Sequence, residues 1–175
     1  MFDLLNLNSN NSYWYRNAYK KISGNKNIPS GGFASGNSSS LKDVLMRFIR
    51  GNFFIPDARK GWNNYAFDAA CELIEKEKPD AIITSSPPHS TQLIGLKLKK
   101  KFGIRWIADL RDPWTDIYFY KKMLHTPFAK AADKKYEREV LENADTIVCV
   151  SDSIKNSFLK KSPLVKKEKI AVIPN

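Results

Sequence analysis

The stretch from Pro79 to Trp114 constrains the fold more than any other part of this chain, because it has the pattern of strand, loop, helix, strand and loop. The run from Ala81 to Thr84 is apolar and leads into two serines and two prolines, which is typical of a buried strand entering a turn. A helical pattern follows and stops at Gly103, and strand character resumes from Arg105 to Leu110. This order predicts two parallel strands joined by a right-handed helical crossover.

Further helices and strands are predicted on both sides of this unit. A helix with one apolar face is expected from Leu41 to Arg50, with Ser40 as its cap and Gly51 at its end. Ser90 or Thr91 is expected to cap the helix of the central unit. In the helix from Leu41 to Arg50, the apolar residues at helical spacing are Leu41, Val44, Leu45, Phe48 and Ile49. The remaining predicted elements are a helix from Pro56 or Asp57 to Lys78, a helix from Pro127 to Asn143, a strand from Thr146 to Val150, a helix capped by Ser151 to Ser153 that ends near Lys160, and a strand from Ile170 to Ile173.

The alternation of strands and helices argues for an α/β fold, with a Rossmann-like, mostly parallel sheet flanked by helices. Domains of this class usually begin with a strand, and none is visible before Ala81 apart from the weak run from Phe53 to Ile55. We therefore expect the first strand or strands to be lacking. Residues 1–39 are rich in Asn, Ser and Gly and are predicted to be irregular, whereas residues 40–175 are predicted to form the domain.

Chemically capable side chains follow both strands of the central unit. His89 comes after the first strand, and Asp109, Arg111, Asp112 and Trp114 lie at the end of the second. In open α/β sheets, ligands bind just outside the carboxyl ends of the strands. The sequence therefore predicts a functional site at this edge of the sheet.

The formal net charge of +11, from 29 Lys and Arg against 18 Asp and Glu, favours a polyanionic partner. Nucleic acid, an anionic membrane face and phosphate-bearing substrates all fit this charge. Cys71 and Cys149 lie in apolar contexts and are interpreted as reduced structural thiols, so neither a disulfide nor a metal site is expected. With no signal peptide and no membrane-spanning run, we expect a cytoplasmic location, free or peripheral on the inner face of the membrane.

Three separated motifs resemble one family in order and spacing. The stretch DAIITSSPPHSTQLIGLKLKKKFGIRWIADLRDPW is similar to the middle of the amino-terminal domain of GT-B glycosyltransferases of family four. The segment YEREVLENADTIVCVSDSIKNSF resembles the part that follows in that domain, and KEKIAVIPN resembles the approach to the interdomain linker. The RDPW element and the upstream GNFFIPDARKGW further resemble a bacterial subgroup involved in surface-polysaccharide assembly.

This resemblance implies two Rossmann-like domains that face a cleft, of which the amino-terminal one binds the acceptor and the carboxyl-terminal one the nucleotide-sugar. Because the chain stops at Asn175, we expect the donor domain to be absent and the piece to be inactive alone. The full-length enzyme would transfer a hexose-like sugar, with retention, to a glycan or lipid-linked acceptor. The nucleotide-sugar would be a co-substrate, no other cofactor is expected, and an anionic membrane surface is a further expected partner.

The resemblance also suggests roles for the residues at the end of the second strand. Many relatives carry a His-Asp pair where this chain has Arg111 and Asp112. An arginine cannot act as a base at neutral pH, so Arg111 is expected to bind a phosphate or an acceptor anion, or else to order the loop through a salt bridge. Asp112, with Asp109 as the second candidate, is expected to orient or deprotonate the acceptor hydroxyl; the alternative for Asp112 is a loop or helix cap.

Four more residues carry paired interpretations. His89 either binds acceptor hydroxyls or caps its helix. Trp114 either stacks on a sugar ring or anchors the packing of its loop. Ser151 and Ser153 lie at the predicted start of a helix, where they either bind an anion or act only as caps.

Two other classes of function were weighed against these motifs. A basic nucleic-acid-binding α/β domain is the alternative that the charge suggests, but the lysines are spread over several helices and no nucleic-acid-binding motif is recognisable. A dinucleotide-dependent oxidoreductase would need a G-x-G-x-x-G loop after a strand, which the sequence lacks. The sequence therefore favours a glycosyltransferase without a nucleic-acid partner.

Overall fold

A computed structural model describes residues 41–118 and 120–174. The chain divides into two units, Met1–Asn37 and Ser38–Asn175, and the described residues belong to the second unit. The predicted irregular segment 1–39 and the predicted Ser40 cap lie outside the described residues.

The centre of this unit is a parallel sheet of four strands in the order β1-β2-β3-β4. The strands are β1 (Ala81–Ser86), β2 (Arg105–Leu110), β3 (Thr146–Cys149) and β4 (Ile170–Val172). In the register of the sheet, Thr84 lies opposite Ala108, which lies opposite Ile147. The predicted α/β fold with a Rossmann-like parallel sheet is confirmed, and the predicted strands match the observed ones to within two residues.

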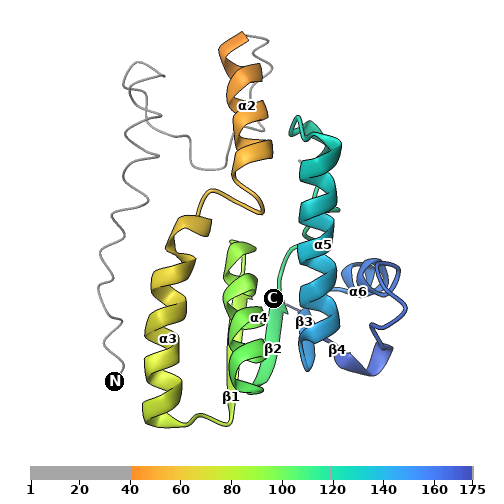
Figure 1. The fold of residues 1–175 in the computed structure, drawn as a ribbon. Coiled ribbons are helices and arrows are strands. Elements are labelled where there is room, and N and C mark those ends of the chain that lie inside the picture. Colours follow the sequence, from red (N-terminus) through yellow and green to blue (C-terminus); the bar gives the residue numbers. More distant parts are fainter. Residues whose placement is uncertain (1–40, 119, 175) are drawn as a thin grey trace. The chain divides into compact units, whose positions relative to one another are not determined.

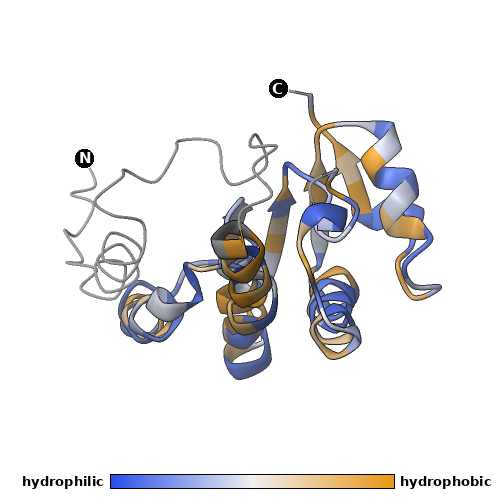
Figure 2. Cartoon of the chain, turned by 90° about the horizontal axis from the view of Figure 1, so that it is seen from above, coloured by the Kyte–Doolittle hydropathy of each residue, from blue (hydrophilic) through white to orange (hydrophobic). Residues whose placement is uncertain are grey.

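The helices are α2 (Leu41–Phe53), α3 (Asn63–Glu77), α4 (Ser90–Phe102), α5 (Pro127–Asn143) and α6 (Asp152–Leu159), with short 3-10 turns η1 (Lys60–Trp62), η2 (Tyr120–Lys122) and η3 (Lys167–Lys169). Helices α4, α5 and α6 connect the four strands, whereas α2 and α3 precede β1 and α3 packs against α4. Because neighbouring strands follow one another in the chain, right-handed crossovers place their helices on the same side. Seen from above, α3, α4 and α5 lie together on that side (Figures 1 and 2).

The main core lies between the sheet and α4, α5 and α6. Trp106, Ala108 and Leu110 alternate along β2 and are completely buried, because every second side chain of this strand points toward the helices. Gly95 of α4 faces the indole of Trp106, and a Cβ atom at Gly95 would lie 2.3 Å from its Nε1 atom. A second cluster, centred on Cys71, packs α3 against α4. On β1, Ile83 points to the other face of the sheet, away from the helices, and is 70% exposed.

At the two ends of α4, one sequence prediction is confirmed and one is wrong. Gly103 ends the helix in the left-handed conformation, with φ of 66°, as predicted. The predicted cap by Ser90 or Thr91 is wrong, because His89 occupies the capping position without a side-chain hydrogen bond. Instead, the backbone N–H and the hydroxyl of Ser90 donate to the two carboxylate oxygens of Asp57, at 2.7 and 2.9 Å. A residue from a distant loop therefore satisfies the start of this helix.

Two further helix predictions need correction. The predicted helix from Pro56 or Asp57 begins only at Asn63, after the 3-10 turn η1. The expected end of the first helix at Gly51 is also wrong, since α2 continues to Phe53. Gly51 is buried against the ring of His125, and a Cβ atom there would lie 3.2 Å from the imidazole Cδ2. Glycine at this position therefore permits close packing rather than ending the helix.

We expect Gly95→Ala to destabilise the domain. Alanine improves helix propensity by about 1 kcal/mol, but its Cβ would overlap an indole that is enclosed by the core. The overlap should outweigh that gain and lower the free energy of unfolding by about 2 kcal/mol, measured by urea denaturation. Lys97→Ala, an exposed change on the same helix, is the control and should alter stability by less than about 0.5 kcal/mol. Equal effects of the two changes would contradict the close contact between Gly95 and Trp106.

Candidate active site

The candidate site lies at the carboxyl ends of β1 and β2, where a buried polar network fixes the strand ends. Gln92 of α4 is completely buried, and its Nε2 atom donates to the carbonyl oxygens of Thr84 (3.1 Å) and Asp109 (2.9 Å). The hydroxyl of Thr84 donates to Gln92 Oε1 at 2.6 Å and accepts from Trp106 Nε1 at 2.8 Å. Since every polar group in this network has a partner, the end of β2 is held rigidly against α4.

The carboxylate of Asp109 lies on the face of the sheet that points away from the helices. Asp109 alternates with the buried residues Ala108 and Leu110 along β2, so its side chain takes the opposite direction. Its Oδ2 atom accepts a hydrogen bond from Ser85 Oγ at 2.7 Å, across the β1–β2 pair. Asp109 is therefore a partly exposed carboxylate positioned by a neighbouring strand.

His89 lies just beyond β1 and is stacked on Trp114, with ring centroids 4.8 Å apart and planes 11° from parallel. Burial lowers the pKa of His89 to about 4, although the charges of Asp57 and Asp112 act in the opposite direction. The imidazole is therefore neutral at pH 7. Its Nδ1 atom is buried and has no hydrogen-bond partner within the described part of the chain.

Trp114 is 2% exposed and is held from behind by α5. Its Nε1 atom donates to Asp133 Oδ1 at 2.8 Å. Burial raises the pKa of Asp133 to about 6, although the hydrogen bond from Trp114 acts in the opposite direction. The indole therefore connects the imidazole of His89 with a buried carboxyl group of α5.

One turn further along α5, Glu137 holds the next residue of the loop. Glu137 is 1% exposed and accepts from the hydroxyl of Thr115 at 2.6 Å and from its backbone N–H at 3.4 Å. Lys161 pairs with the same carboxylate at 2.8 Å and also with Asp116 at 3.0 Å. The loop that follows β2 is thus fixed by two buried carboxylates spaced four residues apart on one helix.

The predicted site residues are distributed as follows. His89 and Trp114 are in contact, and Asp112 is close enough to His89 for its charge to raise the imidazole pKa. Arg111 is exposed, and its backbone N–H donates to the carbonyl of Ser86 at 3.2 Å, which continues the β1–β2 pairing. These four residues therefore belong to one rim, formed by the segments that follow β1 and β2.

Ser151 and Ser153 lie beyond β3. Ser151 caps α6, since its Oγ atom accepts from the N–H of Ile154 at 3.3 Å, in agreement with the capping interpretation. Ser153 lines an open hollow between the loop after β2, α5 and α6. Asp116, Lys134, Asn156, Lys160 and Lys161 contribute to the same hollow. Anion binding by either serine stays a prediction, as does sugar stacking by Trp114, whose surroundings are those of a packing anchor.

Sequence reasoning missed the residues that position the rim, namely Asp57, Gln92, Asp133, Glu137 and Lys161. The only signal in the sequence was the placement of Asp133 and Glu137 at i and i+4 on a helix whose inner face is otherwise apolar. Asp57 is 33 residues from its partner Ser90, and Lys161 is 24 residues from its partner Glu137. No local sequence pattern predicts contacts between residues so far apart in the chain.

The described residues contain no group of three His, Cys, Asp or Glu side chains that could hold a metal ion. Both cysteines are free and buried. None of the helices in the described part of the chain is both long and apolar enough to cross a membrane.

These features define a Rossmann-like α/β domain whose polar side chains gather at the carboxyl ends of parallel strands, where such folds bind ligands. The sequence model of Glycosyltransferase Family 4 matches residues 32–175. Because this match covers most of the chain, the protein belongs to glycosyltransferase family 4. No curated protein matches the chain significantly.

The pKa values of His89 and Asp133 predict opposite effects of pH on stability. His89 has a folded pKa of about 4 against 6.5 when unfolded, so its contribution to the free energy of unfolding falls as pH drops from about 6.5 to 4. Asp133 has a pKa of about 6 in the folded state against 3.8 when unfolded. Its contribution to the free energy of unfolding therefore falls as pH rises from about 3.8 to about 6. The two trends therefore partly cancel in the wild-type protein.

Single substitutions should separate the two trends. Relative to His89→Asn, the wild type should lose up to about 3 kcal/mol of stability between pH 6.5 and pH 4. Relative to Asp133→Asn, it should instead gain stability over the same fall in pH. Urea denaturation at several pH values measures both differences. A pH-independent difference for His89→Asn would contradict a neutral, buried imidazole in the folded state.

Proposed function

We propose that this domain forms the acceptor side of a glycosyl-transfer site, with the rim at the ends of β1 and β2 as its wall. Family membership supports glycosyl transfer in general. The observation that carries the finer proposal is the gathering of Asp109, Asp112 and neutral His89 at one edge of the sheet. Carboxylate and imidazole groups are the side chains that orient and deprotonate a sugar hydroxyl.

Within this proposal, Asp112 is the base that acts on the acceptor hydroxyl, and Asp109 is the second candidate for that role. The neutral imidazole of His89 accepts a hydrogen bond from another hydroxyl of the acceptor or donates one to it. Arg111 of the rim provides a guanidinium, and Ser151, which lies after the neighbouring strand β3, provides a helix amino terminus; each is proposed to bind an anionic group, such as a phosphate of the donor or acceptor. Trp114 is buried and supports the rim through its stacking on His89.

The donor in this proposal is a nucleotide-sugar, which serves as co-substrate and binds on a separate, carboxyl-terminal domain. The transfer retains the anomeric configuration, and the acceptor is a glycan or a lipid-linked precursor of a cell-surface polysaccharide. This assignment rests on the resemblance of the RDPW and GNFFIPDARKGW motifs to a subgroup of the family. The proposed location is the cytoplasm, at the inner face of the membrane.

In the full-length enzyme, we expect Asp112→Asn to reduce the rate of glycosyl transfer by about 10²–10⁴-fold, because an amide cannot accept the hydroxyl proton. The measurement is the release of nucleoside diphosphate from a nucleotide-sugar in the presence of a membrane acceptor extract. The melting temperature should stay within about 2 °C of the wild-type value, since Asp112 is a half-buried loop residue outside the core.

Asp80→Asn is the matched control for this experiment. Asp80 is an exposed aspartate directly before β1, at the opposite edge of the sheet. Its substitution should leave the transfer rate unchanged. If Asp112→Asn transfers sugar as fast as Asp80→Asn, the base is not Asp112, and Asp109 and His89 become the residues to replace.

A further inference from the structure

An open hollow lies between the loop after β2, α5 and α6, outside the rim that carries the candidate site. Figure 1 shows α6 beside α5. The volume of the hollow is about 940 Å³, within the range of small-molecule sites, which is about 300–1,000 Å³. None of the rim residues His89, Arg111, Asp112 and Trp114 lines it. The hollow is thus a feature of the fold that the proposed function does not use.

The lining of the hollow is hydrophilic throughout. Every side chain that the described part of the chain contributes to it is polar or charged, whereas small-molecule sites are usually lined mainly by apolar and aromatic side chains. A lipid chain would therefore find no apolar side chain to pack on, and a nucleobase would find no aromatic ring to stack on. The hollow instead fits a ligand that is polar over its whole surface, such as a sugar.

A saturated polar network forms the floor of the hollow. Lys161 Nζ donates to Glu137 Oε2 and to Thr115 Oγ1, at 2.8 Å each, and pairs with Asp116 at 3.0 Å. Asp116 also accepts a hydrogen bond from the hydroxyl of Ser157. Because three acceptors occupy the three ammonium protons of Lys161, this lysine is fully bonded by the groups of the floor. A ligand must therefore be bound by the other side chains of the hollow.

Three cations on the walls of the hollow are not part of this network. Lys134 and Arg138 are four residues apart on α5, where like charges repel one another, and Lys160 follows α6 on the other wall. The ion pair of Arg138 with Glu142 measures 4.0 Å, and the same carboxylate oxygen accepts a shorter bond of 2.6 Å from Ser162. An anion between the walls would relieve the repulsion, and phosphate oxygens accept charge-assisted hydrogen bonds from both Arg and Lys.

We propose that the hollow binds a phosphorylated sugar. The phosphate contacts Lys134, Arg138 and Lys160 on the two walls, and the sugar hydroxyls form hydrogen bonds with Asp116 and Asn156. Four cationic side chains against two acidic ones line the hollow, so the excess of two positive charges matches a phosphate dianion. This binding goes beyond the proposed function, because it uses other residues and needs no glycosyl transfer. Since Asp116 belongs to the loop that follows β2, a bound ligand would also hold that loop against α5.

The test is calorimetric titration of the 175-residue chain with glucose 6-phosphate, glucose and inorganic phosphate as separate probes, at constant ionic strength. We expect a dissociation constant of about 1 mM or below for glucose 6-phosphate, as for a polar ligand of this size. Glucose and inorganic phosphate should each bind at least about tenfold more weakly, because each lacks one half of the proposed contacts. Lys134→Gln with Lys160→Gln should weaken the binding of glucose 6-phosphate at least about tenfold, because two charge-assisted hydrogen bonds are lost.

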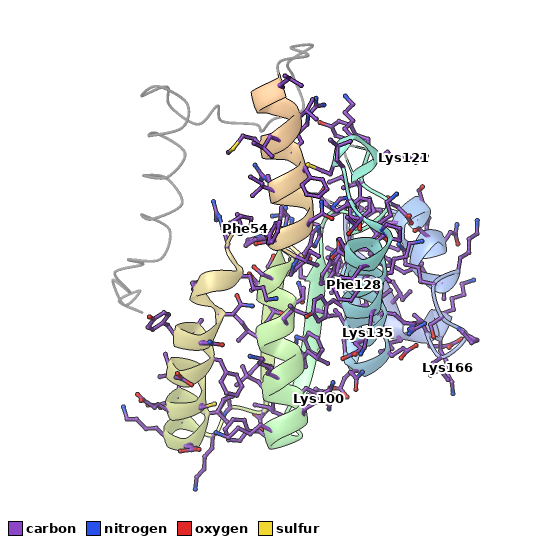
Figure 3. The ribbon with its side chains drawn as sticks, turned by 45° about the horizontal axis from the view of Figure 1, so that its top comes forward. Phe54, Lys100, Lys121, Phe128, Lys135 and Lys166 are labelled. Atoms are coloured by element: carbon purple, nitrogen blue, oxygen red, sulfur yellow. The ribbon has the colours of Figure 1, made fainter. Side chains whose placement is uncertain are left out.

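Matched controls remove charge elsewhere. Lys135→Gln with Lys166→Gln changes two exposed lysines, one on α5 and one beyond α6, that do not line the hollow (Figure 3). Arg111→Gln removes a cation of the rim. Both controls should bind glucose 6-phosphate like the wild type, and circular dichroism should report the same fold for all variants. Because the substituted side chains are exposed, none of the changes is expected to unfold the domain.

Four results would overturn the proposal. The first is no binding of glucose 6-phosphate up to about 10 mM. The second is equal weakening by both lysine pairs, which would mean attraction by net charge alone. The third is a loss of binding in Arg111→Gln instead, which would place the anion at the rim. The fourth is equal affinity for inorganic phosphate, which would exclude a role of the sugar. Because binding is measured without donor or acceptor, it can fail while Asp112→Asn still abolishes transfer in the full-length enzyme, and the reverse also holds.

Discussion

The arrangement of the candidate site depends on two buried carboxylates, Asp133 and Glu137, on the inner face of α5. A carboxylate removed from water is costly unless hydrogen bonds or opposite charge replace its hydration. Trp114 Nε1 satisfies Asp133, while Thr115 and Lys161 satisfy Glu137. Breaking such a pair on one side costs about 3–5 kcal/mol, so the loop after β2 has little freedom to leave α5.

This constraint determines the chemistry available at the rim. Because Trp114 is held by α5, its ring gives His89 a fixed stacking partner and contributes to the burial that keeps the imidazole neutral. On the other side, Gln92 holds the end of β2 through the carbonyl of Asp109. Arg111 and Asp112 therefore lie between two anchored points, one on α4 and one on α5. Such a loop can present a carboxylate in a defined direction, which a base that acts on a hydroxyl requires.

The sequence predicted those parts of the fold that depend on local chemistry. The apolar run of β2, the left-handed Gly103 and the proline that begins α5 each act within a few residues, and each was recognised. Interactions between distant segments were not predictable: Asp57 satisfies the start of α4 from another loop, and Lys161 reaches Glu137 from beyond α6. Hydrophobic periodicity did not predict burial either. The apolar residues of α2 have the spacing of a helix that faces a core, but Leu41, Leu45 and Phe48 are exposed. The hydrophobic pattern of a helix shows that one of its faces is apolar, but not whether that face is buried in the fold.

The most direct test of this account is hydrogen exchange of the backbone amides in residues 111–116, compared between the wild type and Glu137→Gln. An amide at this position weakens the pairing with Lys161 while it keeps the shape of the side chain. If Glu137 holds the loop, exchange in 111–116 should accelerate at least about tenfold, which corresponds to about 1.4 kcal/mol of lost local protection, while β2 and β3 stay protected. Unchanged exchange in the loop, or equal acceleration throughout the sheet, would contradict the central role of the α5 carboxylates.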